Sequence, residues 1–260
     1  MSKMLLLDIG NTNIKIGLAN ADGLLRSFSL PSSRDETADS LGLNLAALLT
    51  QAKVAPRELT AALASSVVPN LNPLLRRACA DYLGLELLFV PEDIPIPLEN
   101  RYAEPSQVGA DRLVGAFAAR RLFPEPASII CVDYGTATTF DCVQENAYLG
   151  GLICPGVLSA ASALSSRTAK LPVVSLEVEG DGPYPGRSTS TSISHGFVFG
   201  FAAMTEGLCL RLSRQMKAPC FVLGTGGFAL PLSRVTGCFD AVRADLLLEG
   251  LRLIQAERHK

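Results

Sequence analysis

An aspartate, a glycine and several small polar residues follow the first apolar run of the chain. The stretch reads Asp8-Ile9-Gly10-Asn11-Thr12-Asn13 and continues into Ile14 and Lys15. Glycine lets the backbone turn tightly and present N–H groups to an anion, and Thr12 adds a hydroxyl donor. Asp8 suits a hydrated Mg²⁺ beside phosphates, and Lys15 could reach a phosphate as a point charge. The alternative is an ordinary turn whose Asp and Asn side chains satisfy the local backbone. The Gly-Lys-Ser/Thr ending of a Walker loop is missing.

A second loop of similar type follows the apolar run 128–133. It reads Asp133-Tyr134-Gly135-Thr136-Ala137-Thr138-Thr139, and its hydroxyl and amide groups could hold a phosphate or coordinate a cation through oxygen. A Thr-rich β-hairpin is the alternative, since threonine favours strands. Asp8 and Asp133 are 125 residues apart, close to half of the 260-residue chain. Two such loops at matching positions make phosphate binding about as well supported as the structural alternative.

The segment Gly109-Ala110-Asp111-Arg112 opens an expected helix. An aspartate at this position commonly caps the helix, which is the simpler interpretation of the local pattern. The functional alternative makes Asp111 a general base on a hydroxyl group and lets Arg112 bind an anionic group in a bidentate manner.

Further small-residue loops leave both structural and functional interpretations open. Close backbone approach to a ligand and tight packing are both compatible with the glycines of Gly150–Gly156 and Gly224–Gly227. Thr189 could cap the helix that follows it or donate to a substrate. Tyr102, in a proline-rich segment, is on local grounds a packing residue.

The elements that position these loops follow the same order in both halves of the chain. The pattern predicts strands at 3–7, 14–19, 24–30, 61–67, 86–90, 128–133, 138–143, 148–154 and 219–223. It predicts helices at 36–53, 71–83, 109–122, 157–166, 190–214, 227–233 and 244–258. Residues 91–107 form a long proline-rich loop. Each half therefore reads as three strands followed by alternating helix and strand, which indicates a gene duplication.

Composition excludes several classes of protein. The formal net charge is −2, the basic residues form no block, and hydrophobic residues make up 48% of the chain. These values argue against a nucleic-acid partner and for a sizeable globular core. No run of 18 apolar residues and no signal-peptide pattern is present, so we expect no membrane partner and a cytoplasmic location. The seven cysteines form no CxxC pair, and we expect free thiols.

Taken in order, these motifs resemble the type III pantothenate kinases, a family within the superfamily of acetate and sugar kinases, heat-shock proteins and actin. The resemblance spans residues 4–255 and adds to the loops above the segments Ser65-Ser-Val-Val-Pro69 and Thr168-Ala-Lys-Leu-Pro172. It implies an α/β fold of duplicated ribonuclease H-like, actin-like domains, each a mixed sheet flanked by helices. The domains would be residues 1–123 and 124–260, with ATP in the cleft between them.

The resemblance also implies an activity and a site. The activity is ATP-dependent phosphorylation of pantothenate to 4′-phosphopantothenate, the first step toward coenzyme A, in a homodimer that uses Mg²⁺ and a monovalent cation, K⁺ or NH₄⁺. Asp111 would be the general base, and Asp133 would hold the monovalent cation. ATP would contact residues Asp8, Ile9, Gly10, Asn11, Thr12, Asn13, Ile14, Lys15, Thr136, Gly226 and Gly227. Pantothenate would contact Tyr102, Gly109, Ala110, Asp111, Arg112 and Thr189.

Two other functions remain compatible with the fold. A kinase of the same superfamily could act on a sugar or on acetate, although Tyr102, Arg112 and Thr189 argue against it. A regulatory protein could keep the fold without catalysis, but it would be expected to lose Asp8, Asp111 or Asp133, and all three are present.

Overall fold

Two β-sheets organise the protein in the computed structural model, which describes residues 2–33, 35–166, 172, 174–177 and 182–258. Within these residues the first sheet contains β1 (Lys3–Ile9), β2 (Asn13–Ala19), β3 (Leu24–Pro31), β4 (Leu59–Ser66) and β5 (Leu87–Val90). The second sheet contains β6 (Glu99–Asn100), β7 (Ser128–Tyr134), β8 (Ala137–Gln144), β9 (Ala147–Pro155), β10 (Cys220–Gly226) and β11 (Ala241–Val242). The α-helices are α1 (Ala38–Gln51), α2 (Asn72–Leu83), α3 (Ala110–Leu122), α4 (Val157–Ser166), α5 (Thr189–Ser213), α6 (Ala229–Ser233) and α7 (Leu246–Arg258).

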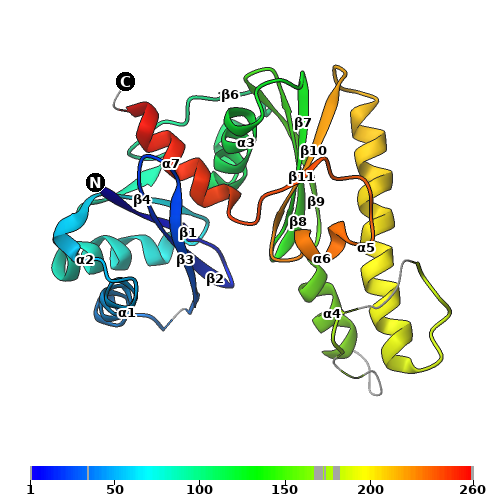
Figure 1. The fold of residues 1–260 in the computed structure, drawn as a ribbon, viewed down its shortest axis with the longest axis horizontal. Coiled ribbons are helices and arrows are strands. Elements are labelled where there is room, and N and C mark those ends of the chain that lie inside the picture. The colour runs from blue at the N-terminus through cyan, green and yellow to red at the C-terminus, as the bar shows by residue number, and fades with distance from the viewer. Residues whose placement is uncertain (1, 34, 167–171, 173, 178–181, 259–260) are drawn as a thin grey trace. The chain divides into compact units, whose positions relative to one another are not determined.

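The strand order is the same in both sheets. The first sheet has the order β3-β2-β1-β4-β5, and the second has the order β9-β8-β7-β10-β11 with β6 added beside β9. In each sheet the first three strands form an antiparallel meander, and the fourth and fifth run parallel to the first. This repeated topology confirms the predicted duplicated α/β fold (Figure 1).

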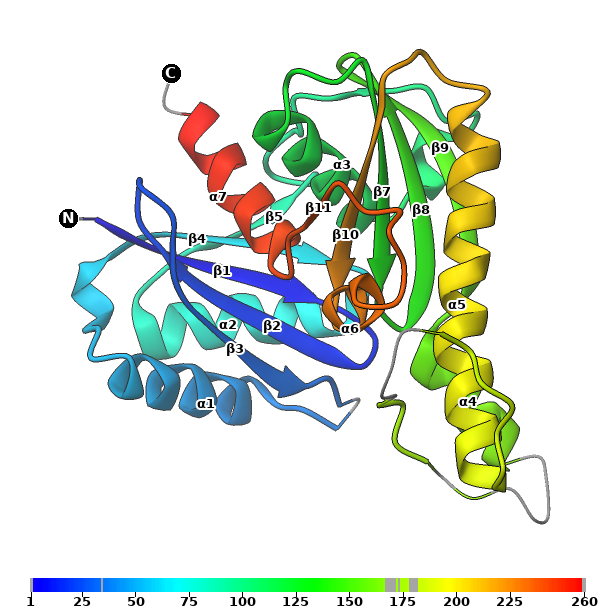
Figure 2. The same cartoon turned by 45° about the vertical axis from the view of Figure 1, so that its right-hand side comes forward.

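The first sheet is covered by helices on both faces. Leu5, Leu7 and Ile9 of β1 pack in a core with α1 and α2, whereas Met4 and Leu6 pack in a core with α3 and α7. Figure 2 shows α1 and α2 on one face of this sheet and α7 on the other. Because side chains alternate along a strand, the residue two positions after Leu6 lies on the α3/α7 face. That residue is Asp8.

The second sheet packs one face against α5 and α6. Ile130, Val132 and Tyr134 of β7 share a core with Val198 and Ala202 of α5. The long helix α5 runs beside this sheet (Figure 1). The alternation of side chains therefore directs Asp133 to the face opposite α5.

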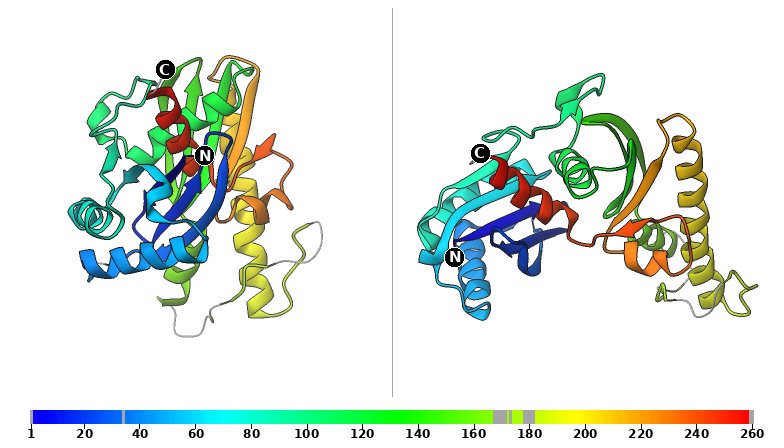
Figure 3. Two further views of the ribbon diagram at one scale, coloured as in Figure 1. Left: turned by 60° about the vertical axis from the view of Figure 1, so that its left-hand side comes forward. Right: turned by 45° about the horizontal axis from the view of Figure 1, so that its top comes forward.

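The chain divides into two compact units, and each unit contains residues from separate parts of the sequence. Unit 1 contains residues 1–99, 103–122 and 245–260, and unit 2 contains residues 100–102 and 123–244. The sequence-based division at 123/124 assigned every later residue to the second half, whereas α7 packs with the first. Gly250 of α7 has no Cβ, and an added one would lie 2.7 Å from Val114 Cγ1 of α3. The Arg121 guanidinium also pairs with Glu257 at 2.5 Å. Figure 3 shows α7 running beside the first sheet. ATP binding in a cleft between the halves stays a prediction.

Other differences from the sequence pattern are local. The predicted loop 91–107 contains β6, and the two-residue strand β11 was not predicted. Ser188, not Thr189, caps α5, because the Ser188 side chain accepts a hydrogen bond from the Thr191 amide at 3.2 Å. Most of the segment 168–172 lies outside the described residues.

Candidate active site

The loop between β1 and β2 forms a tight turn at the carboxyl end of β1. The Gly10 amide donates to the Asn13 carbonyl at 3.0 Å, and the Val67 amide donates to the Ile9 carbonyl at 3.0 Å. Asn11, Thr12 and Asn13 at the tip are exposed. The turn thus presents polar groups to solvent while the flanking strands remain paired.

Lys15 and Ser65 lie beside Asp8 on the same face of the sheet. Lys15 is the cross-strand partner of Asp8 in the antiparallel pair β1–β2, and Ser65 is its partner in the parallel pair β1–β4. Directly opposed residues in an antiparallel pair have Cβ atoms about 4.5–5.5 Å apart. The sheet therefore places a carboxylate, an ammonium group and a hydroxyl next to one another near the carboxyl end of β1.

Asp111 lies in the first turn of α3, close to the same end of the β1–β4 pair. Its Oδ1 accepts a hydrogen bond from the Arg112 amide at 2.8 Å, so the carboxylate also satisfies a backbone donor at the start of the helix. A Cβ built on Gly109 would lie 2.5 Å from Asp111 Oδ1 and 3.5 Å from Val67 Cγ1. Only a glycine at position 109 accommodates the carboxylate in this position.

Burial raises the pKa of the Asp111 carboxyl above its ordinary value. The hydrogen bond from the Arg112 amide and the charge of the Arg112 guanidinium oppose this shift, but the loss of solvation outweighs both. A carboxylate with a raised pKa is a better proton acceptor than an exposed aspartate. The geometry therefore supports the role of a base as well as a local cap.

In unit 2 the loop after β7 meets the glycine loop after β10. Gly226 has a φ of +85°, and a Cβ at this position would collide with Asp133 Oδ1 and lie 2.7 Å from the Tyr134 backbone. The Gly227 amide donates to the Tyr134 carbonyl at 3.1 Å. Gly226 is thus required both for its left-handed backbone and for the close approach of Asp133.

The turn before α4 closes the other side of this loop. The Ser159 hydroxyl donates to the Thr136 carbonyl at 2.7 Å. A Cβ on Gly156 would collide with the Thr136 carbonyl, so this glycine also permits close packing. The structure thereby brings together Asp133, Thr136, Gly226 and Gly227, which the sequence had placed in one site.

Two buried hydroxyls at equivalent positions were not predicted as site residues. Ser65 lies opposite Asp8 and Thr225 lies opposite Asp133, each on the neighbouring parallel strand. Both are buried, and the described residues provide no hydrogen-bond partner for either hydroxyl. The duplicated topology places each hydroxyl one strand away from an aspartate, and this repeated position identifies them as candidate site residues.

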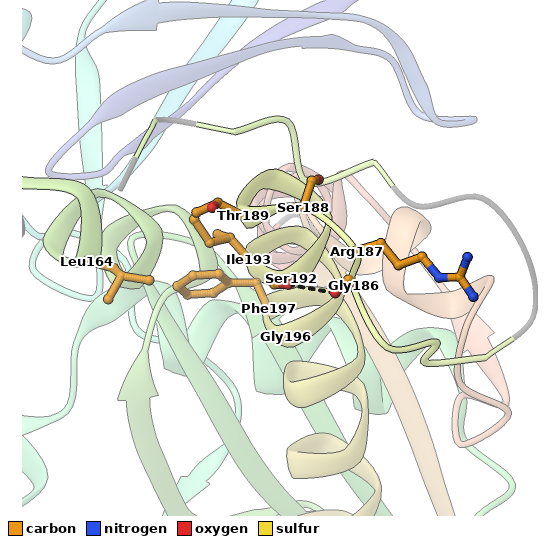
Figure 4. A pocket seen from close by; sticks show the side chains of 9 residues that line it. All are labelled: Leu164, Gly186, Arg187, Ser188, Thr189, Ser192, Ile193, Gly196 and Phe197. Carbon is orange, nitrogen blue, oxygen red and sulfur yellow. Dashed lines mark hydrogen bonds between the residues drawn. The ribbon is translucent and has the colours of Figure 1, made fainter. Parts of the chain in front are cut away.

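Thr189 lines a pocket of about 790 Å³ at the start of α5. Figure 4 shows Thr189, Ile193 and Phe197 on the side of the pocket near Leu164, whereas the Arg187 side chain extends away from them. The Ser192 hydroxyl donates to the Gly186 carbonyl at 3.3 Å and closes the preceding turn. Because Ser188 caps the helix, the exposed Thr189 hydroxyl is not needed for capping.

Tyr102 is held against the second sheet and is not among the residues that line the Thr189 pocket. Its ring lies 6.4 Å from that of Tyr148, and a Cβ on Gly150 would be 3.3 Å from Tyr102 Cδ2. The Tyr102 amide donates to Asn100 Oδ1 at 3.0 Å. These contacts show a packing role for the ring and leave its predicted contact with substrate untested.

The donor set fits hard cations that accompany a triphosphate. No group of three or more His, Cys, Asp or Glu side chains that could hold a metal ion occurs in the described part of the chain. Mg²⁺ typically binds one or two carboxylates together with substrate phosphates and water. Asp8 with the unpaired Ser65 hydroxyl, and Asp133 with the unpaired Thr225 hydroxyl, offer oxygen ligands of this kind.

Solved structures establish the class of fold. A Campylobacter jejuni protein described as a conserved Baf family transcriptional activator has a TM-score of 0.62 and 19% sequence identity, covering 98% of both chains. The inorganic polyphosphate/ATP-glucomannokinase of an Arthrobacter strain has a TM-score of 0.52 and 15% identity, covering 100% of both chains. At these identities the similarity concerns the fold, which is the duplicated actin-like fold with a polar loop after the first strand of each half.

Sequence comparison identifies the family within that class. The model of the type III pantothenate kinase family matches residues 4–211. A protein of Oleidesulfovibrio alaskensis named type III pantothenate kinase is 63% identical over 256 residues, which cover 98% of this chain and 97% of that protein. The chain belongs to the type III pantothenate kinase family, and it is a kinase.

Proposed function

We propose that the protein transfers the γ-phosphoryl group of ATP to the primary hydroxyl of pantothenate and thereby forms 4′-phosphopantothenate. The observation that carries this proposal is the family match over nearly the whole chain. Every segment on which the sequence resemblance rests is intact in this chain. The reaction would be the first step of coenzyme A synthesis.

Asp111 is the proposed general base. Phosphoryl transfer depends mainly on positioning and on neutralisation of charge, so the protein needs a base that orients and deprotonates the acceptor hydroxyl. The raised pKa of Asp111 and its position at the first turn of α3 suit this task. Gly109 and Ala110 would border the acceptor, and Arg112 would bind an anionic group of the substrate.

The loop Asp8–Lys15 is proposed to bind the phosphates of ATP. Its exposed tip offers backbone N–H groups and the Thr12 hydroxyl, and Lys15 adds a positive charge beside Asp8. Mg²⁺ bound with ATP would neutralise part of the phosphate charge. Asp8 and the buried Ser65 hydroxyl supply oxygen atoms on the side of the sheet that carries α3.

The loops of unit 2 are proposed to hold the monovalent cation and the rest of the nucleotide. Asp133 and the Thr225 hydroxyl would be ligands of K⁺ or NH₄⁺, and Thr136 would contact ATP. Gly226 and Gly227 would lie near the adenosine. The close approach of Gly226 to Asp133 supports a shared site, because a change in one loop displaces the other.

A homodimer is the proposed assembly. In the described residues α5 is the one helix long and apolar enough, by length and composition, to cross a membrane. One of its faces is already buried against unit 2, through residues such as Val198, Ala202 and Cys209. Leu158 and Leu164 of α4 and Leu210 of α5 are exposed. A second copy that covers these leucines explains the apolar surface without a membrane.

Complementation tests the proposed function. A bacterial strain without its own pantothenate kinase should grow when it produces this protein and should not grow when it produces the Asp111→Asn variant at the same soluble level. Growth that depends on Asp111 supports the kinase. Failure of the folded wild-type protein, or equal growth with the variant, contradicts it, and a panel of sugar and carboxylate acceptors would then identify the true substrate class.

A further inference from the structure

Two of the seven free cysteines lie close together where the turn after α6 packs against α5. Cys209 is on the buried face of α5, and Cys238 is on the partly exposed turn that leads from α6 to β11. The two side chains interact, and their interaction shifts the pKa values of the two thiols in opposite directions. Cys238 is thus partly exposed and close to a second thiol.

Hydrogen bonds hold the turn that contains Cys238 against α5. The Thr236 hydroxyl donates to Glu206 of α5 at 2.6 Å, and the Cys238 amide donates to the Thr236 hydroxyl at 3.3 Å. Glu206 and Cys209 are three residues apart on α5 and therefore share a face. These contacts place residue 238 beside the face of α5 that carries Cys209.

The electrostatics distinguish Cys238 from the other cysteines. The hydrogen bond with Cys209 lowers the pKa of the Cys238 thiol to about 7, although burial and the nearby Glu206 carboxylate oppose the shift. The same hydrogen bond, together with burial, raises the pKa of the Cys209 thiol. Tyr134 of β7 faces both thiols, and burial raises the pKa of its hydroxyl. By contrast, burial raises the pKa of Cys79 to about 12.

We propose that Cys238 and Cys209 are a redox-sensitive modification site that a low-molecular-weight disulfide converts reversibly to an intramolecular disulfide. The Cys238 thiolate attacks one sulfur of the external disulfide, whose S–S bond breaks and releases one thiolate. Cys209 then loses its proton to that released base and attacks the Cys238 sulfur of the mixed disulfide, which releases the second thiol. The two protein thiols are oxidised, and the external disulfide is reduced to two thiols.

Cys238 is the attacking group of the first step because its thiol has the lower pKa of the two. A thiol whose pKa is near the ambient pH is also the best attacking group in thiol–disulfide exchange. Cys238 meets that condition, and the buried Cys79 does not.

The site is coupled by packing to the loops assigned to ATP, and this part of the inference rests on the proposed function. Phe239 follows Cys238 directly and packs edge-on against Tyr134, with ring centroids 6.2 Å apart. A Cβ on Gly224 would lie 3.2 Å from the Phe239 ring. Formation of the disulfide is expected to move Phe239 and so to weaken ATP binding through the Asp133 and Gly224–Gly227 loops.

Peptide mapping of the full-length protein tests the proposal. The protein is incubated with oxidised glutathione, its remaining thiols are alkylated, and it is digested with trypsin without reduction. We expect a link between peptides 188–211 and 235–243, which contain Cys209 and Cys238 as their single cysteines and lose two hydrogens in total. The link should disappear with dithiothreitol. At pH 7, Cys238 should alkylate roughly tenfold faster than a cysteine of ordinary pKa, because a far larger fraction is thiolate.

Three variants make the result interpretable. Cys238→Ala should abolish the link, Cys209→Ala should leave a persistent mixed disulfide on Cys238, and the control Cys79→Ala should oxidise like the wild type. A folded wild-type protein that forms no link, or that forms mixed disulfides equally on other cysteines, overturns the proposal. A link without a change in ATP affinity overturns the coupling to the nucleotide loops. Absence of pantothenate phosphorylation in the reduced protein counts against the proposed function alone, since the covalent assay does not use the reaction.

Discussion

A methyl group on Gly109 should displace the base while leaving the rest of the protein intact. The Cβ of a Gly109→Ala variant would lie 2.5 Å from Asp111 Oδ1, whereas ordinary contacts begin at 3.4 Å. The carboxylate must therefore withdraw by about 0.9 Å, which also strains its hydrogen bond with the Arg112 amide. A misplacement of about 1 Å can cost roughly 100-fold in rate, equivalent to about 2.7 kcal/mol.

The assay is steady-state ADP release with pantothenate varied at saturating Mg-ATP. Gly109→Ala should lower kcat/KM for pantothenate roughly 100-fold, and Asp111→Asn should lower it by about 10²–10⁴-fold, the range for loss of a general base. ATP affinity, measured separately by calorimetry, should change little in both variants. Gly115→Ala is the matched control, because it lies in the same helix and nothing is within 4 Å of its added Cβ.

Two results would refute this reasoning. If Gly109→Ala keeps the wild-type kcat/KM while Asp111→Asn loses it, the position of the carboxylate does not limit the reaction. If Gly115→Ala is impaired as severely as Gly109→Ala, the effect comes from a general disturbance of α3.

Three further predictions follow from named contacts. Burial raises the pKa of Asp111, and the base must be ionised, so kcat/KM should begin to fall at a higher pH than it would with an exposed aspartate. The same shift means that the ionised carboxylate destabilises the folded protein at neutral pH, so Asp111→Asn should raise Tm there. Gly226→Ala should require more K⁺ for half-maximal activity than Gly227→Ala, since an added Cβ at 226 collides with Asp133 and the φ of +85° disfavours alanine. Gly250→Ala should destabilise the protein by about 1–3 kcal/mol through overpacking against α3, lowering the Tm seen by calorimetry by several degrees.

Each of these has an outcome that contradicts it. A pH profile of wild-type kcat/KM that is flat down to the ordinary range of an aspartate argues against Asp111 as the titrating base. Equal potassium dependence in the Gly226→Ala and Gly227→Ala variants argues against Asp133 as a ligand. Gly207→Ala is the control for the stability prediction, because nothing lies within 4 Å of a Cβ added at this position in α5. If the Tm of Gly250→Ala is as high as that of Gly207→Ala, the packing argument is wrong.

The sequence predicts the repeated topology because its signals are local. Apolar runs and turn residues each report on a few neighbouring residues, and they recover the same order of strands and helices along the two halves of the chain. The order of the strands within each sheet comes from the structure. The assignment of α7 to the first unit is different. It depends on Gly250 meeting Val114 and on Arg121 pairing with Glu257, contacts between residues more than 130 positions apart. The strands β6 and β11 likewise exist only through pairing with distant strands.

The candidate site shows the same division. The residue types of the loops were readable from the sequence, but the contact of Gly109 with the Asp111 carboxylate and that of Gly226 with Asp133 required coordinates. The sequence left Thr189 as either a helix cap or a substrate donor, and the neighbouring Ser188 fills the cap position. Cys238 gave no sequence signal at all, since its partner Cys209 is on another element.

The most direct test is to identify the product formed from ATP and pantothenate by the purified full-length protein. With Mg²⁺ and K⁺ present, mass spectrometry and phosphorus NMR should show one phosphomonoester on the primary hydroxyl of pantothenate for every ADP released. The Asp111→Asn variant should form at least about 100-fold less in the same time. A folded wild-type protein that releases ADP without this product, or that phosphorylates a sugar or carboxylate acceptor in preference to pantothenate, would contradict the account.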